Sequence, residues 1–250
     1  MTMPICLWSG PRNVSTALMY SFAQLENIRV IDEPLYGHYL RVSGAQHPGR
    51  EEVMDAMNCD GDQVVQELLR VQSDDESHTL FVKGMAHHLL DLDLSFLQST
   101  DNIFLIRNPR EMLPSLTVQL PHATLLDTGL QRQWELFRNL SDNGQHPAIL
   151  DSRELLLNPE NALRALCAHL GLDFDIGMLK WDAGARAEDG IWASHWYQPV
   201  HTSTGFAPYK ARFDFPDRLQ GLLDDCNPYY EKLYEHALRA DAAGDLSDPS

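Results

Sequence analysis

Short apolar runs alternate with helical stretches along this chain, and each run has the length of one buried strand. The runs end at polar or turn-forming residues and cover residues 5–8, 28–31, 79–84, 101–107 and 148–151. A helical pattern separates the first two runs, and strands joined in this way pair in parallel. The sequence therefore predicts an α/β fold of three layers, in which helices flank a parallel sheet.

Amphipathic periods and start signals place the helices of this fold. The pattern predicts helices over residues 14–25, 51–57, 62–72, 127–141, 159–170 and 216–239. Another helix is expected to open at Pro109, because proline is favoured in the first turn.

Composition and charge narrow the class of protein. The chain has 250 residues, 44% hydrophobic and 22% charged, which is enough to bury one substantial core. We expect one domain over residues 1–240 and an acidic flexible tail over residues 241–250. The formal net charge of −17 argues against nucleic acid or another polyanion as a partner.

Cysteine usage and hydropathy point to a cytoplasmic protein that does not bind membranes. The 4 cysteines show no C-x-x-C spacing, which is typical of reduced thiols. No apolar run approaches the length of a membrane span. The oligomeric state stays open at this point.

The segment after the first predicted strand combines turn-forming residues with anion-binding side chains. Gly10 and Pro11 interrupt the apolar run, and Arg12 follows them. Ser15 and Thr16 stand on the first turn of the predicted helix. Such a turn directs backbone N–H groups and the positive end of a helix into one pocket. The pocket suits a phosphate or sulfate group.

This loop departs from the Walker A pattern G-x-x-x-x-G-K-[ST]. It has Gly10 and the late hydroxyl residues, but it lacks the second glycine and the lysine. We therefore do not expect an NTPase phosphate loop. A simpler alternative is a helix N-terminus that is capped by the side chain of Asn13 or Ser15.

Charged side chains close the second and third predicted strands. Asp32 and Glu33 follow the second strand, and Lys83 ends the third. Ligands of an open parallel sheet gather beyond the carboxyl ends of its strands, so these groups should emerge near Arg12. A carboxylate there can take the proton of a hydroxyl nucleophile, and a buried lysine needs an anionic partner. Alternatively, Asp32 or Glu33 caps a helix that begins near Leu35.

The fourth predicted strand ends in a second anion-binding pattern. Arg107 closes the strand, Pro109 opens a helix, and Ser115 lies eight residues after the arginine. An NTPase would place a magnesium-binding aspartate near this position. We therefore expect no metal ion in the site.

Together these two motifs resemble the nucleotide-binding loops of the sulfotransferase superfamily. The family's 5′-phosphosulfate loop often reads P-[KR]-S/N-x-[ST]-[ST], and its 3′-phosphate site has R-x-P followed by a serine. The arginine at Arg12 resembles the branch that contains the tyrosylprotein and several bacterial sulfotransferases. The resemblance implies a P-loop NTPase-like sulfotransferase fold and the co-substrate 3′-phosphoadenosine-5′-phosphosulfate (PAPS). It spans about half of the chain and does not cover the acceptor segments.

The resemblance also implies a role for the residues at the matching positions. Arg12 and Lys83 would neutralise the transferring sulfuryl group, and Glu33 would deprotonate the acceptor. The nucleotide would be bound by Gly10, Pro11, Arg12, Asn13, Ser15, Thr16, Arg107 and Ser115.

Other residues compete with Glu33 for the role of base. Asp32 directly precedes it and is the nearest rival. In the cytosolic branch of the family a histidine stands two residues after the lysine, but here that position is Met85. His87 and His88 are therefore second choices.

Two further segments carry aromatic and polar residues without a fixed role. The first comprises Tyr36, His38, Tyr39 and Arg41, which either line an acceptor pocket or form the surface of an amphipathic helix; we favour the surface.

The second segment, residues 181–210, is rich in aromatic residues among glycine, proline, serine and threonine: Trp181, Trp192, Trp196, Tyr197, Phe206 and Tyr209. Such a segment either closes over the nucleotide or packs against the edge of the sheet. The candidates for a closing role are His201, Thr202, Ser203, Thr204, Lys210 and Arg212.

The expected function is transfer of a sulfuryl group from PAPS to a hydroxyl or amine of a small-molecule acceptor. One alternative is an ATP-dependent small-molecule phosphotransferase, which would hold magnesium through Asp32 or Glu33. A second alternative is a non-catalytic protein that binds the 3′-phosphoadenosine nucleotide, because a fold does not fix its chemistry.

Overall fold

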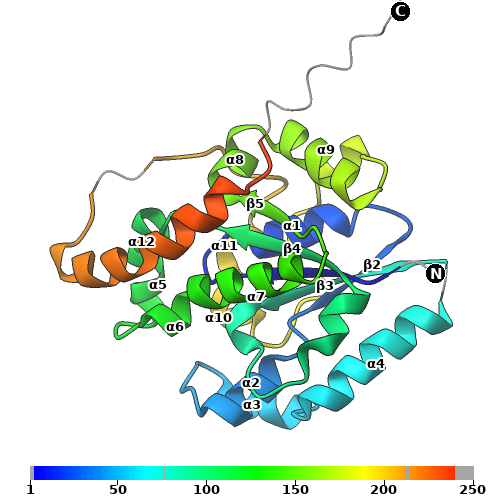
Figure 1. The fold of residues 1–250 in the computed structure, drawn as a ribbon, viewed down its shortest axis with the longest axis horizontal. Helices are drawn as coiled ribbons and strands as arrows, with labels where there is room; N and C mark the ends of the chain where they lie inside the picture. Colours follow the sequence, from blue (N-terminus) through cyan, green and yellow to red (C-terminus); the bar gives the residue numbers. More distant parts are fainter. Residues whose placement is uncertain (1–2, 76, 212–213, 240–250) are drawn as a thin grey trace, which may run out of the picture.

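The chain folds around a five-stranded sheet with strand order β2-β3-β1-β4-β5, and every pair of neighbours is parallel. A computed structural model describes residues 3–75, 77–211 and 214–239 (Figure 1). Arg212 and the tail 241–250 lie outside the described residues. The strands confirm the predicted runs: β1 (Ile5–Ser9), β2 (Ile28–Asp32), β3 (Thr79–Met85), β4 (Asp101–Ile106) and β5 (Ala148–Asp151).

Alternating side chains of the central strand β1 point to opposite faces of the sheet, as strand geometry requires. Ile5 and Leu7 belong to one hydrophobic cluster, and Cys6 and Trp8 belong to the other. All four side chains are buried, so the sheet has a core on both faces. Two covered faces explain why the strands read as continuous apolar runs.

Helices cover both faces and complete the three layers. One face packs against α1 (Ser15–Phe22), α8 (Ser152–Leu157) and α9 (Pro159–Leu170). The other packs against α4 (Gly61–Asp74), α5 (Pro109–Gln119), α7 (Leu130–Asp142) and α12 (Gln220–Glu235). The predicted fold class is confirmed.

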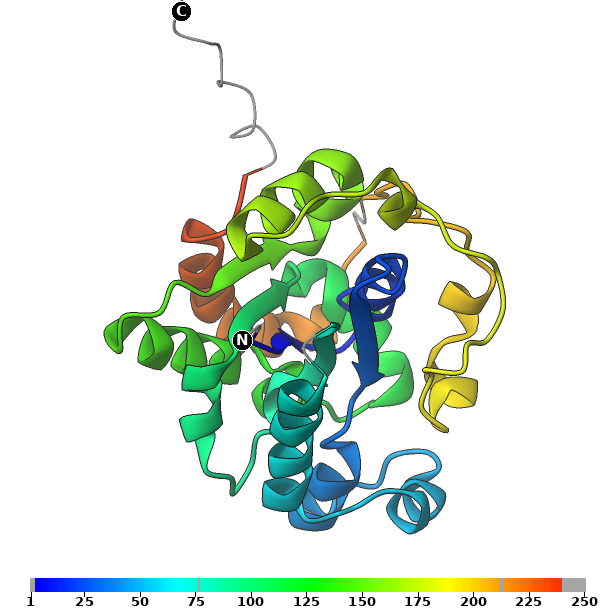
Figure 2. The same cartoon turned by 90° about the vertical axis from the view of Figure 1, so that its right-hand side faces the viewer.

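A third, smaller cluster lies beside the sheet. It joins α2 (Tyr36–Ser43) and α3 (Arg50–Ala56) to the short helix α10 (Ala193–Trp196), which α11 (Gln198–His201) follows. Figure 2 shows this late segment, coloured yellow, passing down one side of the molecule from α9 toward α2 and α3. The short helices that remain are α6 (Leu125–Thr128), η1 (Ala86–His88), η2 (Leu94–Ser99), η3 (Ile176–Leu179) and η4 (Asp217–Leu219).

Some predicted helix boundaries were wrong, and the backbone gives the reasons. The helix expected over residues 127–141 is divided into α6 and α7, because Gly129 has a positive φ of 74°. The first helix begins at Ser15 rather than Val14, which adopts a left-handed conformation with φ 60°. The last helix is shorter than expected and ends at Glu235.

Candidate functional site

A cavity of about 350 Å³ lies where β1, β2, β3 and β4 end. The loop that follows β1 lines one wall, and Glu33, Lys83 and Arg107 reach it from the ends of the other strands. Helix α5, the late segment and residues that include Tyr36, His87 and His88 add further walls. This is the place at which an open parallel sheet binds its ligands.

The loop after β1 adopts a tight conformation at two non-glycine residues. Arg12 and Val14 have positive φ values of 61° and 60°, which cost energy in residues with a Cβ atom. Val14 is the N-cap of α1, and no side chain caps the helix. The alternative in which Asn13 or Ser15 caps it is therefore wrong. The first turn of α1 faces the cavity, and Ser15 and Thr16 line it.

Gly10 and Asn13 pack the loop against neighbouring elements of the fold. Gly10 is not among the lining residues, and a Cβ atom there would collide with the backbone carbonyl of Thr128. Asn13 lines the cavity but is 2% exposed, and its amide donates to the carbonyl of Leu105 at 3.0 Å. The backbone carbonyl of Asn13 accepts a hydrogen bond of 2.9 Å from the hydroxyl of Ser152. These contacts fix the loop on β4 and α8.

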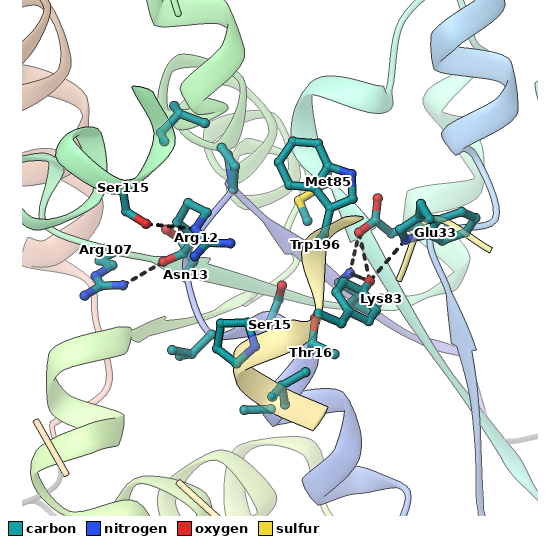
Figure 3. A pocket seen from close by; sticks show the side chains of 18 of the residues that line it. Arg12, Asn13, Ser15, Thr16, Glu33, Lys83, Met85, Arg107, Ser115 and Trp196 are labelled. Carbon is teal, nitrogen blue, oxygen red and sulfur yellow. Dashed lines mark hydrogen bonds and ion pairs between the residues drawn. The ribbon is translucent and has the colours of Figure 1, made fainter. Parts of the chain in front are cut away.

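The two motifs found in the sequence meet at one end of the cavity. The Nε atom of Arg12 donates to the hydroxyl of Ser115 at 2.9 Å, and Arg107 donates to the carbonyl of Arg12 at 2.8 Å. Arg107 also lies 3.6 Å from the carboxylate of Glu111, one turn along α5. Figure 3 shows Arg12, Arg107 and Ser115 grouped on one side of the cavity. The result is a cationic end that suits the phosphate groups of a nucleotide.

Lys83 forms the centre of a buried cluster at the opposite end. Its ammonium group donates to Glu33, to Asp32 at 3.0 Å and to the hydroxyl of Tyr197 at 2.6 Å. Burial on its own lowers the pKa of Lys83, but the two carboxylates outweigh burial and raise this pKa well above its ordinary value. Lys83 is therefore a cation at any physiological pH.

The two carboxylates of this cluster differ in how many hydrogen bonds their oxygens accept. Asp32 accepts hydrogen bonds from Lys83, from Tyr197 at 2.8 Å and from the N–H of Gly190 at 3.2 Å, and it does not line the cavity. Glu33 lines the cavity, and among the described residues the polar neighbour of its Oε2 atom is Nδ1 of His88, at the long distance of 3.9 Å.

Burial raises the pKa of Glu33 above its ordinary value, and Lys83 limits the rise. Neither Glu33 nor Asp32 caps α2, since the N-cap is Leu35 and no side chain bonds to it. The capping alternative is wrong, and Glu33 is the carboxylate that can reach a bound molecule.

Imidazole and phenol rings form the wall next to Glu33. His87 and His88 line the cavity and are at most 5% exposed. Burial lowers the pKa of His87 to about 4 and that of His88 well below its ordinary value, so both rings are neutral at pH 7. Neither Nδ1 atom has a hydrogen-bond partner within the described residues. Tyr39 and Tyr36 stack on His88 with ring centroids 4.4 and 5.1 Å apart.

The residues of α2 correct one expectation. Tyr36, His38 and Tyr39 are buried, so the interpretation of them as a helix surface was wrong. Of the four residues singled out there, Tyr36 alone lines the cavity. His38 bonds to the carbonyl of Leu90 at 2.7 Å, and Arg41 donates to that of Cys59 at 2.9 Å.

The late segment does both of the things expected of it: part of it forms a wall of the cavity, and Trp181 packs in the hydrophobic cluster on one face of the sheet. It contributes lining residues that include Trp192, Trp196, Tyr197, Ser203 and Phe206. The other candidates for closing the site bond to other residues or are exposed. His201 pairs with Asp189 at 2.9 Å, Thr202 donates to the carbonyl of Pro199, and Thr204 and Lys210 are exposed.

Tyr197 lines the cavity and contacts the buried charged cluster, although the sequence assigned it no role of its own. Its hydroxyl donates to Asp32, although 165 positions separate the two residues. It also accepts hydrogen bonds from Lys83 and from the indole of Trp192 at 3.2 Å. Its aromatic segment was noted, but nothing in the local pattern singles out this tyrosine among its neighbours.

The described part of the chain contains neither a metal-binding group of side chains nor a membrane-spanning helix. Within it, no group of three or more histidine, cysteine, aspartate or glutamate side chains has an arrangement that fits a metal ion. Over the same residues, no helix combines the length and apolar character of a membrane span.

Comparison with known proteins identifies the family. Residues 3–237 match the family model described as a sulfotransferase domain. The branched-chain-amino-acid aminotransferase-like proteins 2 and 1 of Arabidopsis thaliana are 39% and 38% identical over 92% and 97% of this chain. The chain spans 41% and 43% of the length of these relatives.

Solved sulfotransferases share the fold at low sequence identity. A sulfotransferase domain from the curacin biosynthetic pathway has a TM-score of 0.54 and 15% identity, covering 91% of this chain and 98% of its own. A sulfotransferase from Alicyclobacillus acidocaldarius has a TM-score of 0.54 and 14% identity, covering 96% and 97%. The chain belongs to the sulfotransferase domain family.

Proposed function

We propose that this protein transfers a sulfuryl group from PAPS to a hydroxyl or amine group of a small-molecule acceptor. The observation that carries the proposal is the division of one cavity into two ends. Arg12, Ser115 and Arg107 are hydrogen-bonded to one another at the first end, and Lys83 and Glu33 form a buried ion pair at the other (Figure 3). A donor bound at the first end would present its sulfuryl group to the second.

The cationic end supplies the groups that a phosphosulfate nucleotide needs. Arg107 and Ser115 would hold the 3′-phosphate, because a guanidinium fork and a hydroxyl match its oxygens. Arg12, Ser15, Thr16 and the N-terminus of α1 would hold the 5′-phosphosulfate. All of these side chains line the cavity.

The residues at the other end suit an in-line transfer. The acceptor oxygen or nitrogen would form a bond to sulfur while the bond from sulfur to the bridging oxygen breaks. The acceptor's proton would pass to Glu33, which lines the cavity. The electron pair of the broken bond would stay on the departing 3′-phosphoadenosine-5′-phosphate (PAP), and Lys83 would stabilise the charge that develops there. We assign the base to Glu33 because Asp32 is fully occupied by hydrogen bonds.

Nucleotide selectivity tests this function against the phosphotransferase alternative. Calorimetric titrations of the wild-type protein with PAP and with ATP, each with and without magnesium, separate the two. We expect PAP to bind with a Kd on the order of micromolar and without dependence on magnesium. Binding of ATP only when magnesium is present, together with no binding of PAP, would contradict the proposal.

A further inference from the structure

The end of the cavity that would hold the acceptor is aromatic and carries anionic groups. Tyr36, Trp192 and Trp196 line it, and the rings of Tyr36 and Trp192 meet edge to face with centroids 5.1 Å apart. Rings in such an arrangement form an apolar box that also attracts a cation to its faces.

A carboxylate from a separate element lies at this aromatic end. Asp127 of α6 lines the cavity, and its Oδ2 atom accepts hydrogen bonds from the N–H and hydroxyl of Thr124 at 2.7 and 2.8 Å. No hydrogen bond reaches its Oδ1 atom from the described residues. Helix α6 adjoins the imidazoles of this wall, because a Cβ atom at Gly129, the residue that ends α6, would lie 3.5 Å from Nδ1 of His87. The cap thus fixes the direction of a carboxylate that keeps one oxygen available.

Cationic side chains are few around this end. Among the described residues, those that line the cavity are Arg12, Lys83 and Arg107. The two arginines belong to the donor end, and Lys83 already contacts two carboxylates. Bound PAPS would add further negative charge beside the acceptor. An anionic acceptor would therefore meet Glu33 and Asp127 without a compensating cation, whereas a cationic acceptor would be attracted.

The imidazoles of this wall do not change the balance of charge. His47 hydrogen-bonds the hydroxyl of Tyr36 at 3.0 Å, and its pKa is lowered by burial, as are those of His87 and His88. All three rings are neutral at pH 7, so they offer polar contacts and no positive charge. The buried Nδ1 atoms of His87 and His88 have no hydrogen-bond partner among the described residues.

We propose that the acceptor is an organic cation with an aromatic or apolar body. Its ammonium group lies beside Asp127 and within the aromatic box, and its hydroxyl or second amine group reaches Glu33. This inference rests on the proposed function, because it assigns the substrate class of the same site. The carboxylate of Asp127 recognises the positive charge of the acceptor. The rings of Tyr36, Trp192 and Trp196 contact its aromatic or apolar part.

Three phenols of similar size whose side chains differ in charge test this assignment. Tyramine is a cation, 4-ethylphenol is neutral and 4-hydroxyphenylacetate is an anion, and all share one ring and one hydroxyl. Each is titrated calorimetrically into the protein saturated with PAP, and again into the protein without nucleotide. We expect tyramine to bind about tenfold more tightly than 4-ethylphenol, and the anion to bind most weakly. Binding as the readout makes the test independent of turnover.

Two variants identify the group responsible. Asp127→Asn removes the charge and should lower the affinity for tyramine about tenfold while leaving that for 4-ethylphenol within twofold. Thr124→Ala disturbs the same cap without removing the charge, and it should keep the preference for tyramine. Equal binding of the three phenols, preference for the anion, an unchanged preference in Asp127→Asn, or no binding at all would overturn the inference. Failure of the protein to bind PAP would instead count against the proposed function.

Discussion

Lys83 holds together a cluster of opposite charges at the end of the cavity away from Arg107. An ammonium group has three N–H donors, and here they face Glu33, Asp32 and Tyr197. For Lys83 to donate to the departing oxygen, one of these contacts must be exchanged. The contact with Tyr197 is the one to a neutral group, so its exchange costs the least electrostatic energy.

The substitution Lys83→Met tests the importance of this cation for stability. Without the ammonium group, Asp32 and Glu33 remain buried as two unpaired carboxyl groups. We expect the free energy of unfolding to fall by about 3–5 kcal/mol, measured by urea denaturation at pH 7. The exposed residue Lys210 supplies the control, because Lys210→Met should change stability by less than about 0.5 kcal/mol. Equal stabilities of the two variants would contradict the buried ion pair.

The hydroxyl of Tyr197 has one proton, which it shares between Asp32 at 2.8 Å and, more weakly, Glu33 at 3.4 Å, so we regard Tyr197 as a positioning residue. The contact with Glu33 lowers the pKa of that carboxyl group against the larger effect of burial, which raises it. In Tyr197→Phe we expect kcat for transfer to a phenol to fall about tenfold with little change in the KM for PAPS. The acid limb of the pH profile should move to higher pH, because Glu33 then holds its proton more tightly.

Tyr234→Phe provides the matched control for this change. Tyr234 also donates to a carboxylate, Glu154, at 2.8 Å, but neither residue lines the cavity. Its kcat and pH profile should match those of the wild type. A Tyr197→Phe enzyme with an unshifted acid limb would show that this hydroxyl does not tune Glu33.

At the scale of secondary structure, the site depends on how the loop after β1 is fastened to its neighbours. The positive φ values of Arg12 and Val14 are strained, and the contacts of Asn13 hold this conformation in place. Because the loop and α5 are joined through Arg12, Ser115 and Arg107, a displaced loop also displaces the nucleotide site.

Removing the Asn13 amide should therefore affect both stability and nucleotide binding. In Asn13→Ala the buried carbonyl of Leu105 loses one of its side-chain donors, and we expect a loss of about 1–2 kcal/mol in the free energy of unfolding. The affinity for PAP should fall together with it, because the loop is released. Wild-type affinity for PAP in this variant, measured by calorimetry, would show that the hydrogen bond of the Asn13 amide is not required for nucleotide binding.

Local sequence patterns were sufficient to predict the strands of the sheet and to single out the two motifs that meet at the cavity. Apolar runs followed by turn residues mark β1 to β5, because both faces of a parallel sheet are buried. The division at Gly129 was missed, since the helical period continues through it. Tyr197 was not assigned a role, because its contact with Asp32 spans 165 positions and no regular period leads to it.

At the scale of the whole molecule, buried histidines make stability depend on pH. The pKa of His87 is lowered from 6.5 to about 4 by burial. The unfolded chain therefore binds a proton at a higher pH than the native protein does. The stability associated with His87 is present above pH 6.5 and is lost as the pH falls toward 4, and His88 acts in the same direction.

Asp151 partly opposes this trend. Burial raises its pKa from 3.8 to about 6, so its effect favours the folded state at low pH. We expect His87→Gln to remove about 3 kcal/mol of the loss in unfolding free energy between pH 6.5 and pH 4, measured by urea denaturation. His236→Gln, at an exposed ring, should leave the slope unchanged. Identical slopes for His87→Gln and the wild type would contradict a buried neutral imidazole.

The charge of the whole chain contrasts with that of the donor end. The net charge is −17, whereas Arg12 and Arg107 line the cavity on one side. The proposed anionic nucleotide would therefore gain its affinity from these local groups rather than from the overall field of the protein. For this reason a single arginine should decide whether the donor binds.

The most direct test of the account compares two nucleotides on two proteins by calorimetry without metal. PAP and adenosine 5′-phosphate differ only in the 3′-phosphate. The wild type should bind PAP about 100-fold more tightly, and Arg107→Ala should lose most of this preference while its affinity for adenosine 5′-phosphate stays within about threefold. If the substitution instead disturbed the fold of the site, the affinities for both nucleotides would fall alike. A wild type that does not distinguish the two nucleotides, or an Arg107→Ala variant that keeps the full preference, would contradict a PAPS site at Arg107 and Ser115.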